Sequence, residues 1–202
     1  MSRLRDLRRD QLDATGQDVW DKITGSRPGN LVNEAGGLVG PFNAFVTAPE
    51  VGRRMNSLGA AVRFGTSIDR RLSEVVIITV GARWKAEFEW WAHAQYAAQY
   101  GVPAAVIEAI GAGEDPPFEA DDERIVYTAA RELVTTGHLG QATYDTAAKL
   151  LGGDAAMVEL VATCGYYSLI SILLNAFQVP LPPGNDLNWP DAVAPDGSAV
   201  GS

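Results

Sequence analysis

The sequence predicts an all-α protein, a single domain built as a helical bundle of about eight helices. Three observations support this prediction. Apolar residues recur at helical spacing, Gly and Pro separate segments rich in helix-favouring residues, and no stretch alternates polar and apolar residues as a half-buried strand does. The chain has 202 residues, 47% of them hydrophobic, which is enough to bury one core without a disulfide or a structural metal.

The first third of the chain alternates helices with loops. Single apolar residues spaced among charged residues predict one or two helices over 3–24, with Gly16 as a possible break. The segment 25–41 contains five Gly and two Pro, which predicts a long loop, and loops of this length are often functional. Pro41 is expected to begin a short helix, and a further helix is expected over 49–63.

The middle of the chain contains the two helices on which the functional argument depends. Asp69 is a favoured N-cap for a helix over 70–84, whose centre (VVIITV) is apolar on nearly all sides and should be buried. Val, Ile and Thr also favour strands, but both flanking segments have helical composition. The next helix, over 86–100, ends at Gly101, a residue type typical of the position after a helix.

The second half is also expected to be helical, with a linker over 111–118. Its predicted helices are 103–110, 120–136, 141–151 and 154–177. The last of these is mostly apolar, so it should be central or lie at a subunit interface. The expected domain organisation is an N-terminal helical arm and Gly-rich loop (1–37), a helical domain (38–183) and a C-terminal tail (184–202).

Composition restricts the partners. Asp and Glu total 25 against 16 Lys and Arg, a net charge of −9. This charge argues against binding to nucleic acid and to anionic membranes.

Uninterrupted apolar runs such as 75–78 and 172–174 are far shorter than the roughly 20 residues of a membrane span. The basic segment 1–10 lacks the apolar core of a secretory signal. A single cysteine, Cys164, cannot form an intrachain disulfide. We therefore expect a cytoplasmic protein.

Glu89 and His93 are the first candidate functional pair. They are four residues apart, so they share one face of the helix over 86–100. A carboxylate and an imidazole in this arrangement can act on two atoms of one small substrate, one taking a proton while the other gives one. Tyr96 lies on the same face of this helix as Glu89 and His93, and Trp90 lies beside that face. The alternative is an ordinary surface pair, which stabilises a helix by a few tenths of a kcal/mol.

Glu74 is the second unusual residue, because it lies one turn into an otherwise apolar helix. A buried carboxyl group there would have a raised proton affinity, which suits proton transfer near neutral pH. The alternative is a structural role, either in a pair with Arg70 or as an acid favoured near a helix N-terminus.

The motif Arg71-x-x-Glu74, the run WKAEFEWWAH at 84–93 and the following Gly101 occur in this order along the chain. Together with shorter segments between 38 and 183, they resemble the carboxymuconolactone decarboxylase family, which includes the alkylhydroperoxidase D-like proteins. The resemblance implies an all-α fold and a homo-oligomer, commonly a trimer or hexamer, with the active site near subunit contacts.

The resemblance also separates two chemistries. In the peroxidase branch a C-x-x-C pair occupies the positions held here by Ala86 and Glu89, and Glu74 matches the glutamate of that branch's proton relay. Both thiols are absent here, so a dithiol redox cycle cannot run within one subunit. Glu89 and His93 resemble the decarboxylase branch, which uses no cofactor.

By this resemblance His93 is the main acid/base, Glu89 orients it or acts as its partner, and Glu74 is a second proton donor or a positioning group. The substrate would be a small anionic, conjugated ring or lactone, transformed by a decarboxylase, lyase or isomerase reaction. An anionic substrate needs a cation nearby. The expected substrate-binding residues are Arg83, Arg71, Tyr96, Trp90 and Phe42, with Arg63 as a further candidate cation.

Three alternatives stay open. Glu74, Glu89 and His93 could hold iron or manganese in principle, but a second histidine is missing nearby, so we expect neither metal nor cofactor. The protein could instead be a non-catalytic oligomeric binding protein. It could also be an alkylhydroperoxidase-type oxidoreductase that uses Cys164 between subunits.

Overall fold

The computed structural model describes residues 2–27 and 29–185. Within these ranges the chain forms nine α-helices and one short 3-10 helix and contains no named strand, which confirms the predicted all-α class. The elements are η1 (Arg9–Gln11), α1 (Ala14–Ser26), α2 (Phe42–Thr47), α3 (Pro49–Phe64), α4 (Arg70–Trp84), α5 (Glu87–Gln99), α6 (Ala104–Ala112), α7 (Asp121–Thr136), α8 (Gln141–Leu151) and α9 (Asp154–Ala176). Most of the expected C-terminal tail, residues 186–202, lies outside the described residues.

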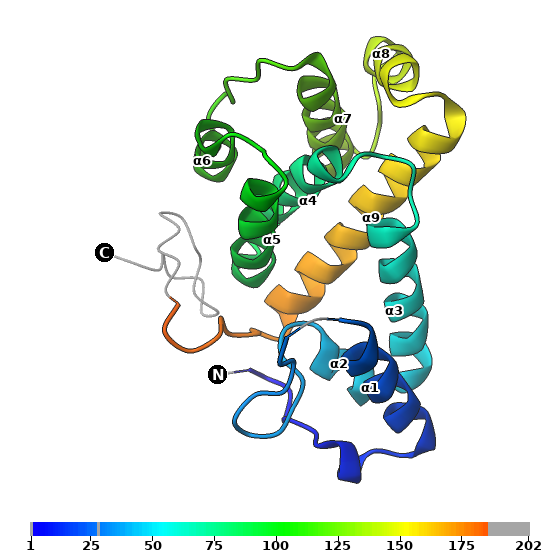
Figure 1. Cartoon of the computed structure of the whole chain (residues 1–202), viewed down its shortest axis with the longest axis vertical. Coiled ribbons are helices and arrows are strands. Elements are labelled where there is room, and N and C mark those ends of the chain that lie inside the picture. Colours follow the sequence, from blue (N-terminus) through cyan, green and yellow to red (C-terminus); the bar gives the residue numbers. More distant parts are fainter. Residues whose placement is uncertain (1, 28, 186–202) are drawn as a thin grey trace.

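Helix α4 lies at the centre of the bundle, beside the long diagonal helix α9 (Figure 1). It packs against α5, α7 and α9, while α1, α2 and α3 pack on one another and α3 reaches α9. The buried apolar side chains of these helices join in one core cluster. The central position of α4 explains its sequence, because every residue from 72 to 81 is buried.

The sequence features that predict the start and the course of α4 act as expected. The Asp69 carboxylate accepts a hydrogen bond from the backbone N–H of Arg71 at 2.9 Å and caps the first turn. The helix ends at Lys85, which has a left-handed backbone conformation (φ 50°). The β-branched centre is helical because burial against three neighbouring helices outweighs a weak strand preference.

The prediction of helix over 3–24 is wrong at its start. Residues 3–8 are not helical, and α1 begins only at Ala14. The Asp13 carboxylate accepts from the backbone N–H of Gly16 at 2.7 Å, so Gly16 belongs to the first turn of α1 and does not break the helix. An aspartate N-cap three residues before the glycine thus sets the boundary.

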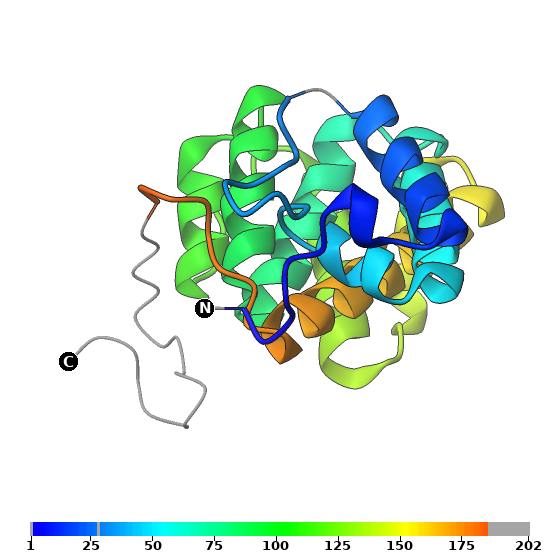
Figure 2. The same ribbon diagram turned by 90° about the horizontal axis from the view of Figure 1, so that it is seen from below.

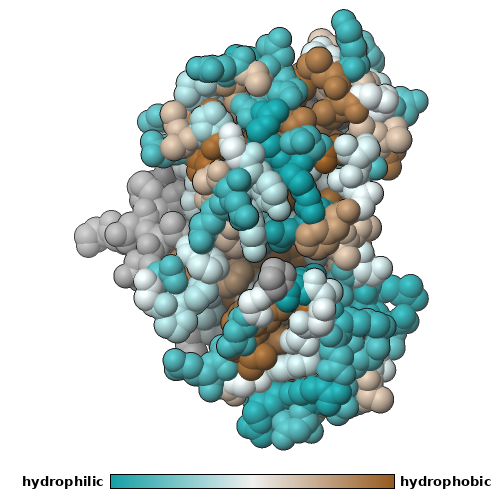
Figure 3. Space-filling view, viewed as in Figure 1, coloured by the Kyte–Doolittle hydropathy of each residue, from teal (hydrophilic) through white to brown (hydrophobic). Residues whose placement is uncertain are grey.

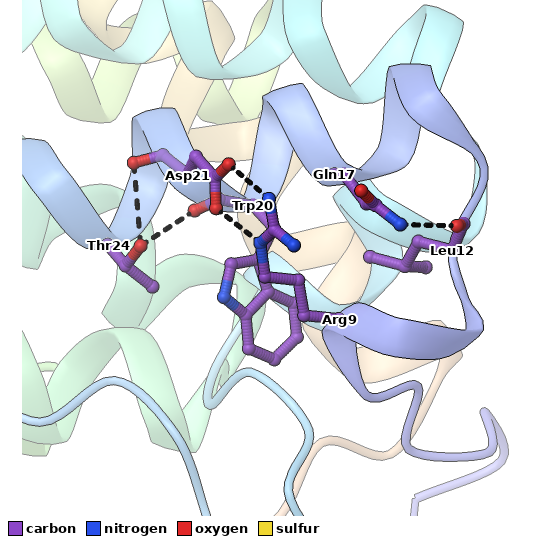
Figure 4. A network of polar contacts seen from close by, with 6 residues as sticks. All are labelled: Arg9, Leu12, Gln17, Trp20, Asp21 and Thr24. Atoms are coloured by element: carbon purple, nitrogen blue, oxygen red, sulfur yellow. Dashed lines mark hydrogen bonds and ion pairs between the residues drawn. The ribbon is translucent and has the colours of Figure 1, made fainter.

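The N-terminal arm is fastened at several points. The backbone N–H of Arg3 donates to the carbonyl of Phe177 at 2.8 Å, and Figure 2 shows the arm crossing from the end of α9 toward α1. Farther along, the Arg9 guanidinium makes two hydrogen bonds of 2.7 Å to the Asp21 carboxylate, which ties η1 to α1 (Figure 4). The arm is therefore ordered against the bundle, although its first residues are not helical.

Helix α9 is long and apolar enough to cross a membrane by length and composition alone, but half of that stretch is buried inside the bundle, as in a core helix of a soluble protein. The solvent-exposed side of α9 carries apolar residues, among them Val158, Val161, Leu169 and Ile172. The face of the molecule seen in Figure 3 is mainly hydrophilic, with several separate apolar patches.

Candidate active site

Three charged side chains meet between α4 and α5. The Nδ1 atom of His93 lies 2.6 Å from Oε2 of Glu74, and its Nε2 atom lies 3.1 Å from Oε1 of Glu89. Glu74 is fully buried, and Glu89 and His93 are each only 4% exposed. Because each ring nitrogen faces a carboxylate, both can donate a hydrogen bond only when the imidazole is protonated. We call Glu74, His93 and Glu89 the histidine cluster.

The electrostatics of the histidine cluster favour the imidazolium form. Burial by itself lowers the pKa of His93, but Glu74 and then Glu89 outweigh it and raise the pKa to about 9. At neutral pH the His93 ring is therefore a buried cation that lies between two carboxyl groups. The cluster holds a transferable proton in a water-poor environment, which is the requirement for a general acid.

Aromatic rings and one further cation surround the histidine cluster. The Tyr167 ring of α9 lies 5.1 Å from the His93 ring, edge-on, and the Tyr96 ring lies 5.6 Å from it. Burial first, and then the charge of Glu89, raise the pKa of Tyr167 well above its usual value, so its hydroxyl stays neutral. The guanidinium of Arg63, on α3, lies 4.4 Å from the centre of the Tyr96 ring.

Two buried charged atoms lack hydrogen-bond partners, Oε1 of Glu74 and Nε of Arg63. The Glu74 carboxylate favours the charged form of Arg63, yet the two side chains form no ion pair among the described residues. Buried polar atoms in folded proteins are nearly always hydrogen-bonded. These two atoms are therefore candidates for contact with the polar groups of a substrate.

The structure brings together four of the predicted site residues, Glu74, Glu89, His93 and Tyr96. It places two predicted substrate-binding arginines elsewhere. Arg71 pairs with Asp122 at 2.8 Å and with Glu123, both on α7. Arg83 is exposed near the end of α4, with its guanidinium 5.8 Å from the Trp84 ring. The sequence could not separate Arg71 from Arg63, because the partners of Arg71, Asp122 and Glu123, lie far along the chain.

The two predicted aromatic residues have different surroundings. Trp90 packs against α6, where a Cβ atom at Gly111 would lie 2.7 Å from its ring, so Trp90 belongs to the core. Phe42 begins α2 and lies under the guanidinium of Arg27, 4.6 Å from its ring centre.

Sequence reasoning missed Tyr167 and Arg27 as site residues. Tyr167 lies in an apolar helix, where an aromatic residue usually indicates core. Arg27 follows the last residue of α1 at the start of the Gly-rich loop, where no periodic pattern marks an inward-facing side chain. The length of that loop was the one available signal.

Neither a thiol nor a metal site adjoins the histidine cluster in the described part of the chain. Cys164 is buried on α9, and burial raises its pKa to about 12, so it stays a neutral thiol. Among the described residues, no group of three or more His, Cys, Asp or Glu side chains is arranged to hold a metal ion. In the histidine cluster the two carboxylates face opposite nitrogens of the His93 ring, so each ring nitrogen already has a carboxylate partner.

The fold is that of the alkylhydroperoxidase D-like proteins. The structure resembles an alkylhydroperoxidase AhpD core structure, an uncharacterized peroxidase-related protein from Ralstonia eutropha JMP134, with a TM-score of 0.73 and 14% identity over 90% of this chain and 93% of that one. It also resembles an uncharacterized peroxidase-related protein from Silicibacter sp. TM1040, with a TM-score of 0.69 and 13% identity over 90% and 92% of the two chains.

A third similar structure is the debrominase Bmp8, as a C82A variant in complex with 2,3,4-tribromopyrrole. Its TM-score is 0.68, with 16% identity over 91% of this chain and 95% of that one. No protein-family model and no curated protein matches the chain. At these identities the similarity establishes the fold, and the chemistry depends on the residues of the site.

Proposed function

We propose that the protein is a cofactor-independent acid/base enzyme, a decarboxylase, lyase or isomerase, that acts on a small anionic conjugated ring or lactone. The observation that carries this proposal is the buried His93 ring, hydrogen-bonded on one side to Glu74 and facing Glu89 on the other. A buried imidazolium is a proton donor, and a carboxylate at the same ring can receive a proton.

In a decarboxylation, the bond between the substrate's carboxylate carbon and its neighbour breaks and carbon dioxide leaves. The electron pair moves through the conjugated system toward a carbonyl group, and His93 delivers its proton at the far end. A proton from solvent then restores the protonated form of the His93 imidazole. In an isomerisation, Glu74 or Glu89 would take a proton from one carbon while His93 gives one to another. Both reactions need no protein group beyond the histidine cluster, and burial strengthens the electrostatic effect of its charges.

Two further observations support this proposal. Ala86 and Glu89 stand at the two positions where the peroxidase branch resembled by this sequence has cysteines, and the remaining cysteine, Cys164, is buried and neutral. A structurally similar protein, the debrominase, binds 2,3,4-tribromopyrrole. A small conjugated ring is therefore a substrate class compatible with this fold.

The test follows ultraviolet absorbance over a panel of carboxylated lactones and dienoates, with and without a chelator. We expect the wild type to turn over at least one compound in the presence of the chelator. His93→Gln should reduce the rate about 100- to 10,000-fold, because general acid/base catalysis contributes that much. Arg83→Gln, an exposed substitution on α4, is the matched control and should keep the wild-type rate.

Two results would overturn the proposal. Loss of turnover in the chelator would assign the chemistry to a metal. Absence of turnover for every compound, with a folded wild-type protein, would point to a non-catalytic binding protein.

A further inference from the structure

We infer that Arg27, carried by the N-terminal arm, and Arg63 together form the binding site for the substrate's carboxylate, so that the arm completes the active site. The inference rests on the proposed function for the identity of the ligand as a small conjugated acid. Carboxylate binding is nevertheless measured at equilibrium, so it can be tested when no turnover occurs.

One face of α3 aligns the parts of this site. Asn56, Gly59 and Arg63 are spaced i, i+3 and i+7, which places them on one side of the helix. Nη2 of Arg27 donates to Oδ1 of Asn56 at 2.9 Å. One turn farther, the hydroxyl of Tyr166 lies so close to Gly59 that a Cβ atom there would clash with it. Arg63 follows one more turn along.

Both arginines act on the same tyrosine. Burial, and then the charge of Glu89, raise the pKa of Tyr166, while the nearby charges of Arg27 and Arg63 oppose this rise. The Tyr166 hydroxyl itself lies against Gly59, which stands between Asn56 and Arg63 on this face of α3. The two guanidinium groups therefore both lie near the Tyr166 hydroxyl.

Neither arginine has a carboxylate partner. Arg27 donates to two neutral oxygens, Oγ of Ser26 at 3.1 Å and Oδ1 of Asn56 at 2.9 Å. Arg63 keeps a buried Nε without a partner, and neither guanidinium forms an ion pair within residues 2–27 and 29–185. Two partly buried cations are thus left uncompensated by ion pairs in a chain whose net charge is −9. A bound carboxylate would accept charge-assisted hydrogen bonds from both.

A series of ring contacts leads from these cations to His93. Phe42 lies under Arg27, and the Tyr166 ring packs edge-on against Tyr167 at 5.3 Å. Tyr167 in turn contacts the His93 ring at 5.1 Å. A ligand whose carboxylate binds the arginines can lay its conjugated carbons along these rings, with the far end toward the proton on His93.

The test measures binding of sorbate (2,4-hexadienoate) by isothermal titration calorimetry, with the uncharged 2,4-hexadienamide as the matched ligand. The wild type should bind sorbate and not the amide. Arg27→Gln and Arg63→Gln should each weaken sorbate binding about tenfold or more, the usual loss of a hydrogen bond to a charged group. Arg83→Gln should bind sorbate like the wild type.

Circular dichroism establishes that each variant is folded. If a glutamine variant is unfolded, Arg27→Lys or Arg63→Lys replaces it, since lysine keeps the charge but loses the forked geometry and should bind sorbate more weakly.

Several results would overturn the inference. They are equal binding of sorbate and the amide, no saturable binding of sorbate to the wild type, unchanged affinity in both arginine variants, and displacement of sorbate by equal concentrations of inorganic phosphate. Sorbate binding that depends on both arginines, in a protein that turns over no compound of the panel, would refute the proposed function and leave this inference standing.

Discussion

Helix α4 contributes to two ion clusters from positions only three residues apart. Glu74 belongs to the histidine cluster. Arg71 pairs with Asp122 and Glu123 on α7, and we call these three residues the arginine cluster. Each cluster buries a glutamate, with Glu74 fully buried and Glu123 only 3% exposed. The two clusters differ in the cation that compensates the buried charge.

This difference separates a structural role from a chemical one. An arginine in a protein does not lose its proton at any relevant pH, so the arginine cluster can hold α4 against α7 but cannot transfer a proton. The pKa of His93 is about 9, close enough to neutrality for its proton to be given up and recovered. The two clusters are similarly buried, but the arginine cluster holds two helices together, whereas the histidine cluster contains a candidate proton donor.

The largest expected effect comes from making the same substitution in both clusters. Glu74→Gln removes the strongest favourable charge at His93, and we expect kcat/KM to fall at least about 100-fold. Glu123→Gln should leave kcat/KM near the wild-type value, because it lies in the arginine cluster. Steady-state kinetics on a compound that the wild type turns over check this prediction, and equal losses in the two variants would contradict it.

The arginine cluster should matter for stability instead. Arg71→Met leaves Glu123 buried beside Asp122 without a cation. Breaking a buried ion pair costs 3–5 kcal/mol, and because Arg71 is 27% exposed we expect the lower end, about 3 kcal/mol. Urea denaturation measures the loss. In the double variant Arg71→Met/Glu123→Leu part of it should return, and a full additional loss would argue against the pair.

The histidine cluster should make stability depend on pH. The folded pKa of His93, about 9, lies above its ordinary value of 6.5. The contribution of the protonated ring to stability is therefore complete below pH 6.5 and is lost as the pH rises through 9, by at most about 3 kcal/mol. The titratable groups that face the ring are Glu74, Glu89, Tyr96 and Tyr167.

Denaturation of the wild type and of His93→Gln at pH 6 and pH 9.5 measures this dependence. The wild type should lose stability over this interval and the variant should lose much less. A parallel decline in both proteins would assign the pH dependence to other groups.

The smallest effect is expected at a surface pair. Arg9 and Asp21 make two good hydrogen bonds, but their side chains are about half exposed, at 48% and 53%. Solvent screens such pairs, and many contribute nothing measurable. Arg9→Ala should leave the melting temperature unchanged within error. A clear fall would show that the arm depends on this contact more than its exposure suggests.

Local features of the sequence were sufficient for most helices. Asp69 as N-cap, Gly101 after α5 and the apolar centre of α4 act within a few residues, so their consequences can be derived without knowing the fold. Local reasoning failed at residues 3–8, where charged and apolar residues resemble a helix but tertiary hydrogen bonds hold the chain in another conformation. The Arg3 backbone, for example, bonds to Phe177 at the far end of the described chain.

By itself the sequence determined the helical class, the shared face of Glu89 and His93, and the absence of a thiol pair, because helix periodicity and residue identity are properties of short segments. Tertiary structure alone decided that Glu74 reaches His93 from another helix, and that Arg71 is neutralised while Arg63 is not. These outcomes depend on which side chains meet across helices. In a buried site, the identity of the partner decides whether a charge serves structure or chemistry.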